Sequence, residues 1–199
     1  MNKQDLLMVG VGGQGIILAS DILGEVALSA GYDVKKTDTL GMAQRGGSVL
    51  SHVRIASQVC SPLIKEGEVD MLVAFEKLEA ARWDYFLRPG GLAIVNNHAM
   101  PPLSVSLGTA RYPTDEEVGN ILRRQTNRIC FTNGTGKAAE LGDVRTLNMF
   151  MLGCISPFLA IDVELWKDCI SQRMPSRILQ INIAAFDLGR KETSNVNFG

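Results

Sequence analysis

Residue types that would mark several kinds of site are scarce or scattered in this 199-residue chain. The four cysteines, Cys60, Cys130, Cys154 and Cys169, are far apart, so no C-x-x-C or ferredoxin-like spacing occurs. We therefore expect that this chain alone holds neither an iron–sulfur cluster nor a structural zinc. We expect reduced and mostly buried thiols, as in a cytoplasmic protein.

Concentrated charge and long apolar runs are missing too. The net charge is −1 and no basic run exceeds two residues, which gives no general argument for nucleic acid or an anionic membrane as a partner. No segment approaches the roughly 20 apolar residues of a membrane helix. The N-terminal apolar run is too short and wrongly flanked for a signal peptide. We expect a cytoplasmic protein with no nucleic-acid or membrane partner.

The chain has a regular alternation of expected strands and helices. Hydrophobic residues make up 46% and aromatic residues only 6%, which predicts a mostly aliphatic core. Short apolar runs alternate with segments of helical periodicity, and the last third is mainly helical. This order predicts an α/β fold: a Rossmann-like, mainly parallel sheet with helices on both faces. The sequence shows no internal repeat and no linker. We therefore expect one α/β domain over residues 1–190 and a tail over 191–199. The expected strands cover 5–10, 32–40, 48–57, 68–75, 91–97 and 128–133, and the expected helices cover 15–30, 76–87, 114–125, 134–143, 145–159, 162–174 and 175–191.

Three local predictions are more detailed. In 48–57, the alternation predicts a strand with one exposed face. Residues 98–113 carry three prolines, which favours a loop with one short strand. Thr114 followed by Glu117 has the spacing of a capping box at a helix start.

The first distinctive motif is MVGVGGQGIILAS, residues 8–20. It contains G-x-G-x-x-G between an expected strand and an expected helix, formed by Gly10, Gly12, Gly13, Gln14 and Gly15. Such glycines permit a tight turn and a close backbone approach, and the helix N-terminus then offers free N–H groups to an anion. The motif favours a nucleotide-like or other phosphate ligand. The alternative is a glycine turn needed only for packing or for a subunit contact.

A nicotinamide or flavin enzyme is the first function to consider for this motif. It requires an acidic residue near the end of the second strand to bind a ribose, and Asp38 lies close to the expected spacing. However, Lys35 and Lys36 precede it, and no proton-relay pair typical of a dehydrogenase follows. We therefore keep a free-standing dinucleotide-dependent oxidoreductase as the alternative function, and a loop or capping carboxylate as the other reading of Asp38.

The second motif is TDTLGMAQRGGSVLSHVRI, residues 37–55. An arginine fork, flexible glycines and a hydroxyl together suit a phosphate or carboxylate. Because parallel strands place their C-terminal loops at one edge, we expect this loop beside the first one. The other interpretation is a strand start whose glycines relieve crowding, with the arginine in an ordinary ion pair. The candidate ligand-binding residues here are Thr39, Gly41, Arg45, Gly46, Gly47 and Ser48.

Other residues have two interpretations each. His52 suits a polar sheet face or an interface, and His98 suits a solvated loop or a contact with a ligand or partner. Gly134, Gly136 and Lys137 suit a helix start or a phosphate contact, although the P-loop spacing is missing. The apolar run 147–159 suits either the core or an interface with a larger subunit.

The two glycine motifs, in this order and about 30 residues apart, resemble the gamma module of 2-oxoacid:ferredoxin oxidoreductases. The likeness is greatest to the small (beta) subunit of indolepyruvate ferredoxin oxidoreductase. It extends over about residues 5–190 through EGEVDMLVAFEKLEAARW, LRPGGLAIVN and AAELGDVRTLNMFMLG. The segment GMAQRGGSVLSHVR favours the aryl-pyruvate branch of the family over the pyruvate branch.

This resemblance implies a subunit of a larger enzyme that converts a 2-oxoacid and coenzyme A to acyl-CoA and carbon dioxide and reduces ferredoxin. It implies that thiamine diphosphate, magnesium and the iron–sulfur clusters lie on the large partner, and that this chain binds none of them alone. The small subunit is expected to position coenzyme A and to complete the active site, with no catalytic residue of its own. A third possibility is an assembly module whose glycine loops contact only protein.

Overall fold

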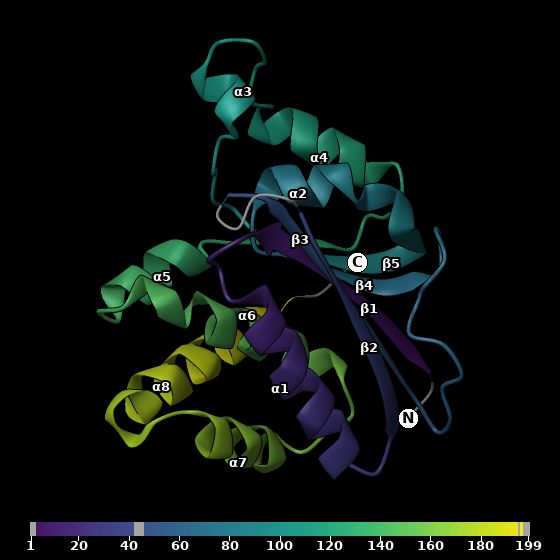
Figure 1. Ribbon diagram of the computed structural model, residues 1–199, viewed down its shortest axis with the longest axis vertical. Coiled ribbons are helices and arrows are strands. Elements are labelled where there is room, and N and C mark those ends of the chain that lie inside the picture. Colours follow the sequence, from purple (N-terminus) through teal and green to yellow (C-terminus); the bar gives the residue numbers. More distant parts are fainter. Residues whose placement is uncertain (1–2, 42–45, 195, 197–199) are drawn as a thin grey trace.

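The computed structural model describes residues 3–41, 46–194 and 196 and contains a six-stranded sheet with the order β2-β3-β1-β4-β5-β6 (Figure 1). The strands are β1 (Gln4–Val11), β2 (Asp33–Leu40), β3 (Ser48–Ala56), β4 (Val69–Ala74), β5 (Leu87–Asn96) and β6 (Ile129–Thr132). The helices are α1 (Ile16–Ser29), α2 (Lys77–Arg82), α3 (Leu103–Ser106), α4 (Asp115–Arg123), α5 (Gly134–Glu140), α6 (Leu147–Ile155), α7 (Val163–Arg173) and α8 (Ser176–Thr193). Short 3-10 turns cover Asp84–Phe86, Val144–Thr146 and Ser156–Phe158.

The sheet is mainly parallel, as predicted, with one reversed strand. Strand β1 pairs in parallel with β4, β4 with β5, and β5 with β6. Strand β3 is antiparallel to both of its neighbours, β1 and β2. Strands β1 and β2 therefore run in the same direction and end at the same edge of the sheet, which is where β3 begins.

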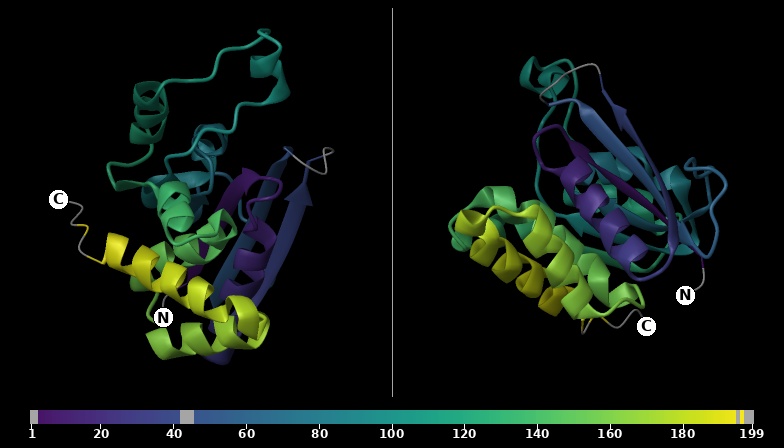
Figure 2. Two further views of the ribbon diagram at one scale, coloured as in Figure 1. Left: turned by 90° about the vertical axis from the view of Figure 1, so that its left-hand side faces the viewer. Right: turned by 60° about the horizontal axis from the view of Figure 1, so that its bottom comes forward.

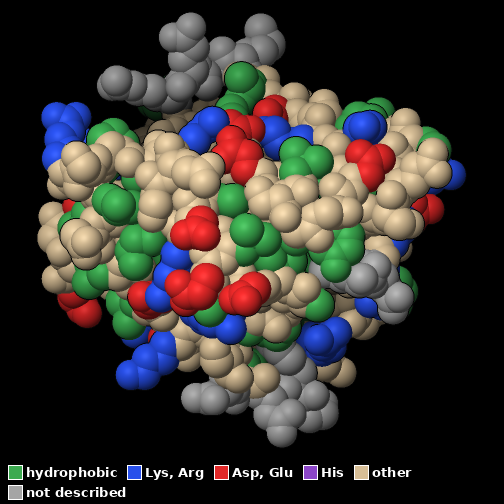
Figure 3. All heavy atoms as spheres, turned by 90° about the horizontal axis from the view of Figure 1, so that it is seen from below, with side chains coloured by type: hydrophobic (Ala, Val, Ile, Leu, Met, Phe, Trp, Pro, Cys, Tyr) green, Lys and Arg blue, Asp and Glu red, His purple; other side chains and the backbone are tan. Residues whose placement is uncertain are grey.

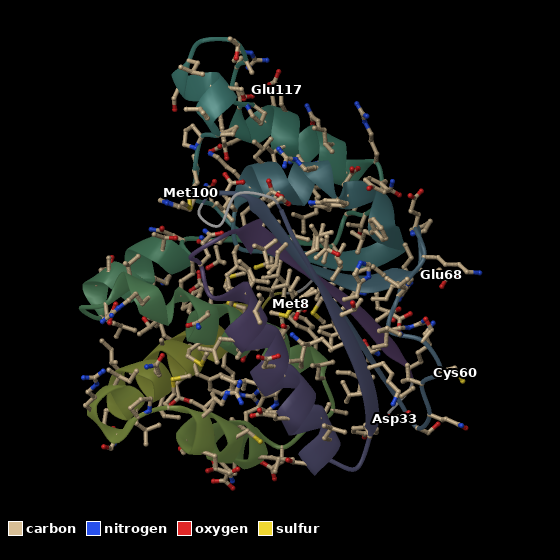
Figure 4. All side chains as sticks on the ribbon, viewed as in Figure 1. Met8, Asp33, Cys60, Glu68, Met100 and Glu117 are labelled. Atoms are coloured by element: carbon tan, nitrogen blue, oxygen red, sulfur yellow. The ribbon has the colours of Figure 1, made fainter. Side chains whose placement is uncertain are left out.

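Helices cover both faces of the sheet, which confirms the predicted α/β class (Figures 1 and 2). One face packs against α1, α6, α7 and α8, and its core includes the fully buried Met8 at the centre of Figure 4. The opposite face packs against α2 and α4. Successive residues of β1 alternate between the two cores, Leu6 and Met8 on one side and Leu7 and Val9 on the other, as the pleat of a strand requires.

Helices α6 and α8 touch backbone to backbone. A Cβ added to Gly153 would lie 2.0 Å from the carbonyl oxygen of Phe186, and one added to Gly189 would lie 1.9 Å from that of Phe150. Only glycine fits at both positions. All nine residues of α6 are buried, so the apolar run beginning at 147 belongs to the core, and the alternative interpretation of α6 as an interface is wrong.

Two local predictions need correction and one is confirmed. Strand β3 is buried on both faces, because α1 covers one side and Ile64 and Phe86 lie against His52 on the other. The segment 98–113 contains helix α3 and no strand, and it projects beyond the sheet (Figure 2). The capping box is present: Thr114 accepts from the Glu117 N–H, and the Glu117 carboxylate accepts from the Thr114 N–H.

The surface has mixed charge. On the face shown in Figure 3, acidic and basic side chains lie among each other and no large region has a single sign. Within the described ranges, no helix is long and apolar enough to cross a membrane.

Candidate functional site

The first glycine loop joins the end of β1 to the start of α1. Gly13 and Gly15 have φ values of +106° and +79°, which L side chains rarely adopt. Gln14 braces the loop: its Oε1 accepts from the Val11 N–H at 2.8 Å, and its Nε2 donates to the Phe75 carbonyl at 2.9 Å. Gln14 thereby fixes the turn. Its predicted contact with a ligand remains a prediction.

The N-terminus of α1 is open. Gly15 is the N-cap residue and has no side chain, so nothing caps the helix there. The first intrahelical bond runs from the Ala19 N–H to the Gly15 carbonyl, which leaves the N–H groups of Ile16, Ile17 and Leu18 with no helical acceptor. Free N–H groups at the positive end of a helix dipole are a favourable environment for an anion.

The two glycine loops lie side by side, as predicted from the sequence. The Gly12 N–H donates to the Gly47 carbonyl at 2.9 Å, and the Gly41 N–H donates to the Ser48 carbonyl at 2.8 Å. The physical reason includes a feature that the sequence analysis missed, namely the antiparallel β3 that brings the second loop back next to β1. A Cβ on Gly41 would lie 2.9 Å from the Ser48 carbonyl, so a side chain would separate these strands.

A cavity of about 560 Å³ lies between the first loop and the β2–β3 hairpin. We call it the hairpin cavity. Among the described residues, its lining is uncharged and mostly aliphatic. It includes Gly12, Gly13, Gly15, Leu18, Leu40 and Gly41.

A second cavity, of about 600 Å³, lies between the same loop and the C-terminal helices. We call it the helical cavity. It shares Gly13, Gly15 and Leu18 with the hairpin cavity. Its other walls come from the turn before α6, from α6 itself and from the start of α8, and they include Asp143, Arg145, Asn148, Arg177 and Asn182.

The other candidate ligand-binding residues do not all face the first glycine loop. The Ser48 hydroxyl donates to the buried Glu79 at 2.5 Å, on the α2 side of the sheet. Thr39 pairs with Leu50, whose side chain belongs to that same core, so Thr39 faces the same side. Gly46 has a φ of +79°, which suits a glycine. Arg45 lies outside the described residues, and its role remains a prediction.

Asp38 is engaged by the protein itself. It accepts from Lys36 at 2.7 Å and from the Ser51 hydroxyl at 2.6 Å. In addition, β3 separates β2 from β1, whereas the dinucleotide fold places the ribose-binding carboxylate on a strand beside β1. Both observations favour the structural reading of Asp38 over the ribose-binding one.

Several other candidates have structural partners. His52 is buried on β3, where desolvation lowers its pKa. Asn133 caps α5 by accepting from the Gly136 N–H, and Lys137 pairs with Glu192 at 3.2 Å, which supports a helix start there. In the part of the chain that the structure describes, no three His, Cys, Asp or Glu side chains come together as a metal site.

Sequence reasoning predicted the glycine-loop side of the helical cavity but missed its residues from α6, from α8 and from the turn before α6. Asn148 is 5% exposed and packs against Gly15, because a Cβ on that glycine would be 2.7 Å from the Asn148 amide nitrogen. A polar residue within the apolar run 147–159 was the available signal. Arg145 and Arg177 carried no such signal, because surface arginines are common on helices.

Comparison with known proteins agrees with the predicted resemblance. Residues 5–192 match the protein family described as pyruvate ferredoxin/flavodoxin oxidoreductase. The chain belongs to this family. Indolepyruvate oxidoreductase subunit IorB of Pyrococcus horikoshii is 37% identical over 194 residues, 96% of each chain. The corresponding subunit of Archaeoglobus fulgidus is 38% identical over 189 residues, 94% of each chain.

Solved structures with the same fold include subunits of oxidoreductases. The gamma subunit of a keto/oxoacid ferredoxin oxidoreductase from Geobacter sulfurreducens has a TM-score of 0.72 at 22% identity, covering 97% of this chain and 99% of that one. The 2-oxoglutarate:ferredoxin oxidoreductase from Magnetococcus marinus, solved with 2-oxoglutarate, coenzyme A and succinyl-CoA, has a TM-score of 0.76 at 20% identity. That match covers all of this chain and 32% of the longer one. As a member of the pyruvate ferredoxin/flavodoxin oxidoreductase family, the chain is a subunit of an oxidoreductase.

Proposed function

We propose that this chain is the small subunit of a thiamine-dependent indolepyruvate ferredoxin oxidoreductase. The observation that carries the proposal is the 37% identity, over nearly the full length of both chains, to the IorB subunit of Pyrococcus horikoshii. The reaction joins the acyl group of a 2-oxoacid to the thiol of coenzyme A, releases carbon dioxide and a proton, and passes two electrons to ferredoxin.

The residues of this chain indicate which cofactors the large partner holds. Thiamine diphosphate supplies the carbanion chemistry, and with magnesium and the iron–sulfur clusters it belongs to the large partner. Within the described residues, the cysteines are free, Cys60 exposed and Cys130, Cys154 and Cys169 buried. We assign no catalytic residue to this subunit. Ferredoxin meets the complex through the partner.

The subunit's own task is to position coenzyme A and to complete the active site. Coenzyme A carries a diphosphate, and the joined glycine loops with the open N-terminus of α1 suit such a group. The neighbouring hairpin cavity has the aliphatic lining that suits the pantetheine chain. The Magnetococcus protein of the same fold was solved with coenzyme A bound, which supports this ligand class.

The experiment is reconstitution. This chain is expressed together with the large subunit, and dye reduction is measured with indolepyruvate, pyruvate or 2-oxoglutarate, with and without coenzyme A. We expect reduction that requires both subunits and coenzyme A and is fastest with an aryl-pyruvate. Equal activity of the large subunit alone, or no dependence on coenzyme A, would reject the proposal.

A second measurement addresses the glycine loops. Arg45→Ala in the assembled complex should weaken coenzyme A binding. Unchanged affinity would reject the predicted role of Arg45, and NAD binding by the isolated chain would instead favour the dinucleotide-dependent alternative.

A further inference from the structure

The helical cavity is distinguished from the hairpin cavity by its charge. Its lining carries two guanidinium groups, Arg145 and Arg177, and one carboxylate, Asp143, among the residues that the structure describes. Arg145 binds Asp143 closely, with Nη2 to Oδ2 at 2.6 Å and Nε to Oδ1 at 2.9 Å. Hydrogen bonding from this guanidinium lowers the pKa of Asp143, so the carboxylate is neutralised by its own neighbour. One positive charge remains in excess.

Arg177 supplies that excess charge. It lies in the first turn of α8 and is exposed, and its side chain makes no ion pair or hydrogen bond to any residue in the described ranges. By contrast, Arg173, near the end of the preceding helix, pairs with Glu25 at 2.9 Å and with Asp21 at 3.4 Å. An unpaired guanidinium at the wall of a cavity is available for a bidentate contact with an anion.

Two buried amides complete the lining. Asn148 is 5% exposed, its Oδ1 accepts from the Met149 N–H, and its Nδ2 has no acceptor in the described part of the chain. Asn182 is also 5% exposed, and its Nδ2 donates to the Ile178 carbonyl at 2.7 Å, which leaves its Oδ1 without a donor there. Neither of these two unpaired atoms is sealed from solvent, and both residues line the cavity. The cavity therefore presents one donor, the Nδ2 of Asn148, and one acceptor, the Oδ1 of Asn182. The hydrogen bond that each amide makes to the backbone fixes its orientation.

We infer that the helical cavity binds a phosphate monoester attached to a nucleoside and, resting on the proposed function, that this group is the 3′-phosphate of coenzyme A. Arg177 holds the phosphate as an ion pair, and the Nδ2 of Asn148 donates to it. The Oδ1 of Asn182 accepts from a hydroxyl or amino group of the nucleoside. The shared wall of Gly13 and Gly15 then lets one ligand lie across the loop, with its diphosphate at α1 and its pantetheine in the hairpin cavity.

The test uses the assembled complex and two ligands that differ by this one phosphate, coenzyme A and dephospho-coenzyme A. Dissociation constants are measured by calorimetry without 2-oxoacid for the wild type and for Arg177→Gln. We expect Arg177→Gln to weaken coenzyme A binding roughly tenfold or more, as loss of a charged hydrogen bond would, and to leave dephospho-coenzyme A unchanged. Arg177→Lys should recover part of the loss.

Controls separate this inference from the proposed function. Arg123→Gln removes another exposed arginine, from α4 on the other face of the sheet, and should change neither constant. If coenzyme A binds and Arg177→Gln weakens both ligands equally or neither, the inference fails while the proposed function stands. If the wild-type complex binds no coenzyme A, both fail. Asn148→Ala is a second variant, expected to weaken coenzyme A more than dephospho-coenzyme A.

Discussion

The side chain of Gln14 ties the glycine loop to the end of β4 through Phe75. Its Nε2 donates to the Phe75 carbonyl at 2.9 Å, while its Oε1 accepts from the Val11 N–H at 2.8 Å. The Phe75 carbonyl also accepts from Asn96 at 2.9 Å, and the Phe75 N–H donates to the Val9 carbonyl at 2.8 Å. Phe75 is therefore the point where the loop, the central strand and β5 are joined, so the position of the ligand loop depends on a residue of the core.

Replacing Gln14 by Ala should lower the free energy of unfolding by about 1–3 kcal/mol, because the Val11 N–H would lose its acceptor while it stays largely shielded from water. The Phe75 carbonyl keeps its bond from Asn96, so the Val11 N–H is the group left unpaired. Urea unfolding at pH 7 measures the change. The matched control is Gln172→Ala, an exposed position in α7, which should stay within about 0.5 kcal/mol of the wild type. Equal effects at both positions would contradict the bracing role.

Gly13 and Gly15 should respond differently to alanine. Gly13→Ala meets no atom within 4 Å, so its cost is the left-handed backbone alone, about 1 kcal/mol. Gly15→Ala adds a contact at 2.7 Å with the amide nitrogen of Asn148 and should destabilise the chain more. Denaturant unfolding of both variants tests the order. In the double variant Gly15→Ala with Asn148→Ala the added cost should fall below the sum of the single changes, and strict additivity would show that the two residues do not meet.

The sequence predicts those parts of the structure that depend on residues adjacent in the chain. The G-x-G-x-x-G turn, the capping box at Thr114 and the position of α1 follow from residues adjacent in the chain, and the structure contains all three. The reversal of β3 does not follow, because an apolar run has no direction. The buried state of both its faces depends on residues such as Phe86, which are remote in sequence. The helical cavity could not be predicted either, because its residues are far apart in the sequence. Asn148 contacts Gly15 only because α6 packs beside α1.

Tyr112 should make stability depend on alkaline pH. Its hydroxyl donates to the buried carboxylate of Glu76, which also accepts from the N–H of Met100 at 3.0 Å, at the base of the projecting segment (Figure 4). Burial, and then the bond to Glu76, raise the pKa of Tyr112 above its ordinary value of 10.0. The folded state therefore retains a proton that the unfolded state releases, so this contribution is complete below pH 10 and is lost as pH rises further.

The comparison that isolates this effect is with Tyr112→Phe. The variant should be less stable at pH 7 by about 1–3 kcal/mol, since Glu76 loses a donor, and its stability should fall less steeply than that of the wild type above pH 10. Chemical unfolding at several pH values measures both slopes. Tyr32→Phe is the control for general alkaline effects. Parallel slopes for the wild type and Tyr112→Phe would refute the assignment.

Glu117 should titrate far below an ordinary glutamate. The Arg111 guanidinium binds its carboxylate with Nη1 to Oε2 at 2.9 Å, and the Thr114 N–H donates to Oε2 at 2.8 Å. These bonds, that from Arg111 first, lower its pKa from 4.5 to about 2. A depressed pKa in the folded state means that the contribution to stability is present above pH 4.5 and is lost as pH falls toward 2. Carboxyl resonances followed by NMR over this range measure the value directly.

Arg111→Ala should return the Glu117 pKa toward 4.5 while leaving part of the depression, because the Thr114 N–H remains. Arg123→Ala, on the same helix and bound to Asn120 at 3.0 Å, should leave the Glu117 titration unchanged. A Glu117 that titrates near 4.5 in the wild type would show that the Arg111 bond is absent in solution. The start of α4 would then depend on the Thr114 hydroxyl alone, and Thr114→Ala would lower the free energy of unfolding by about 1 kcal/mol whether or not Arg111 is present.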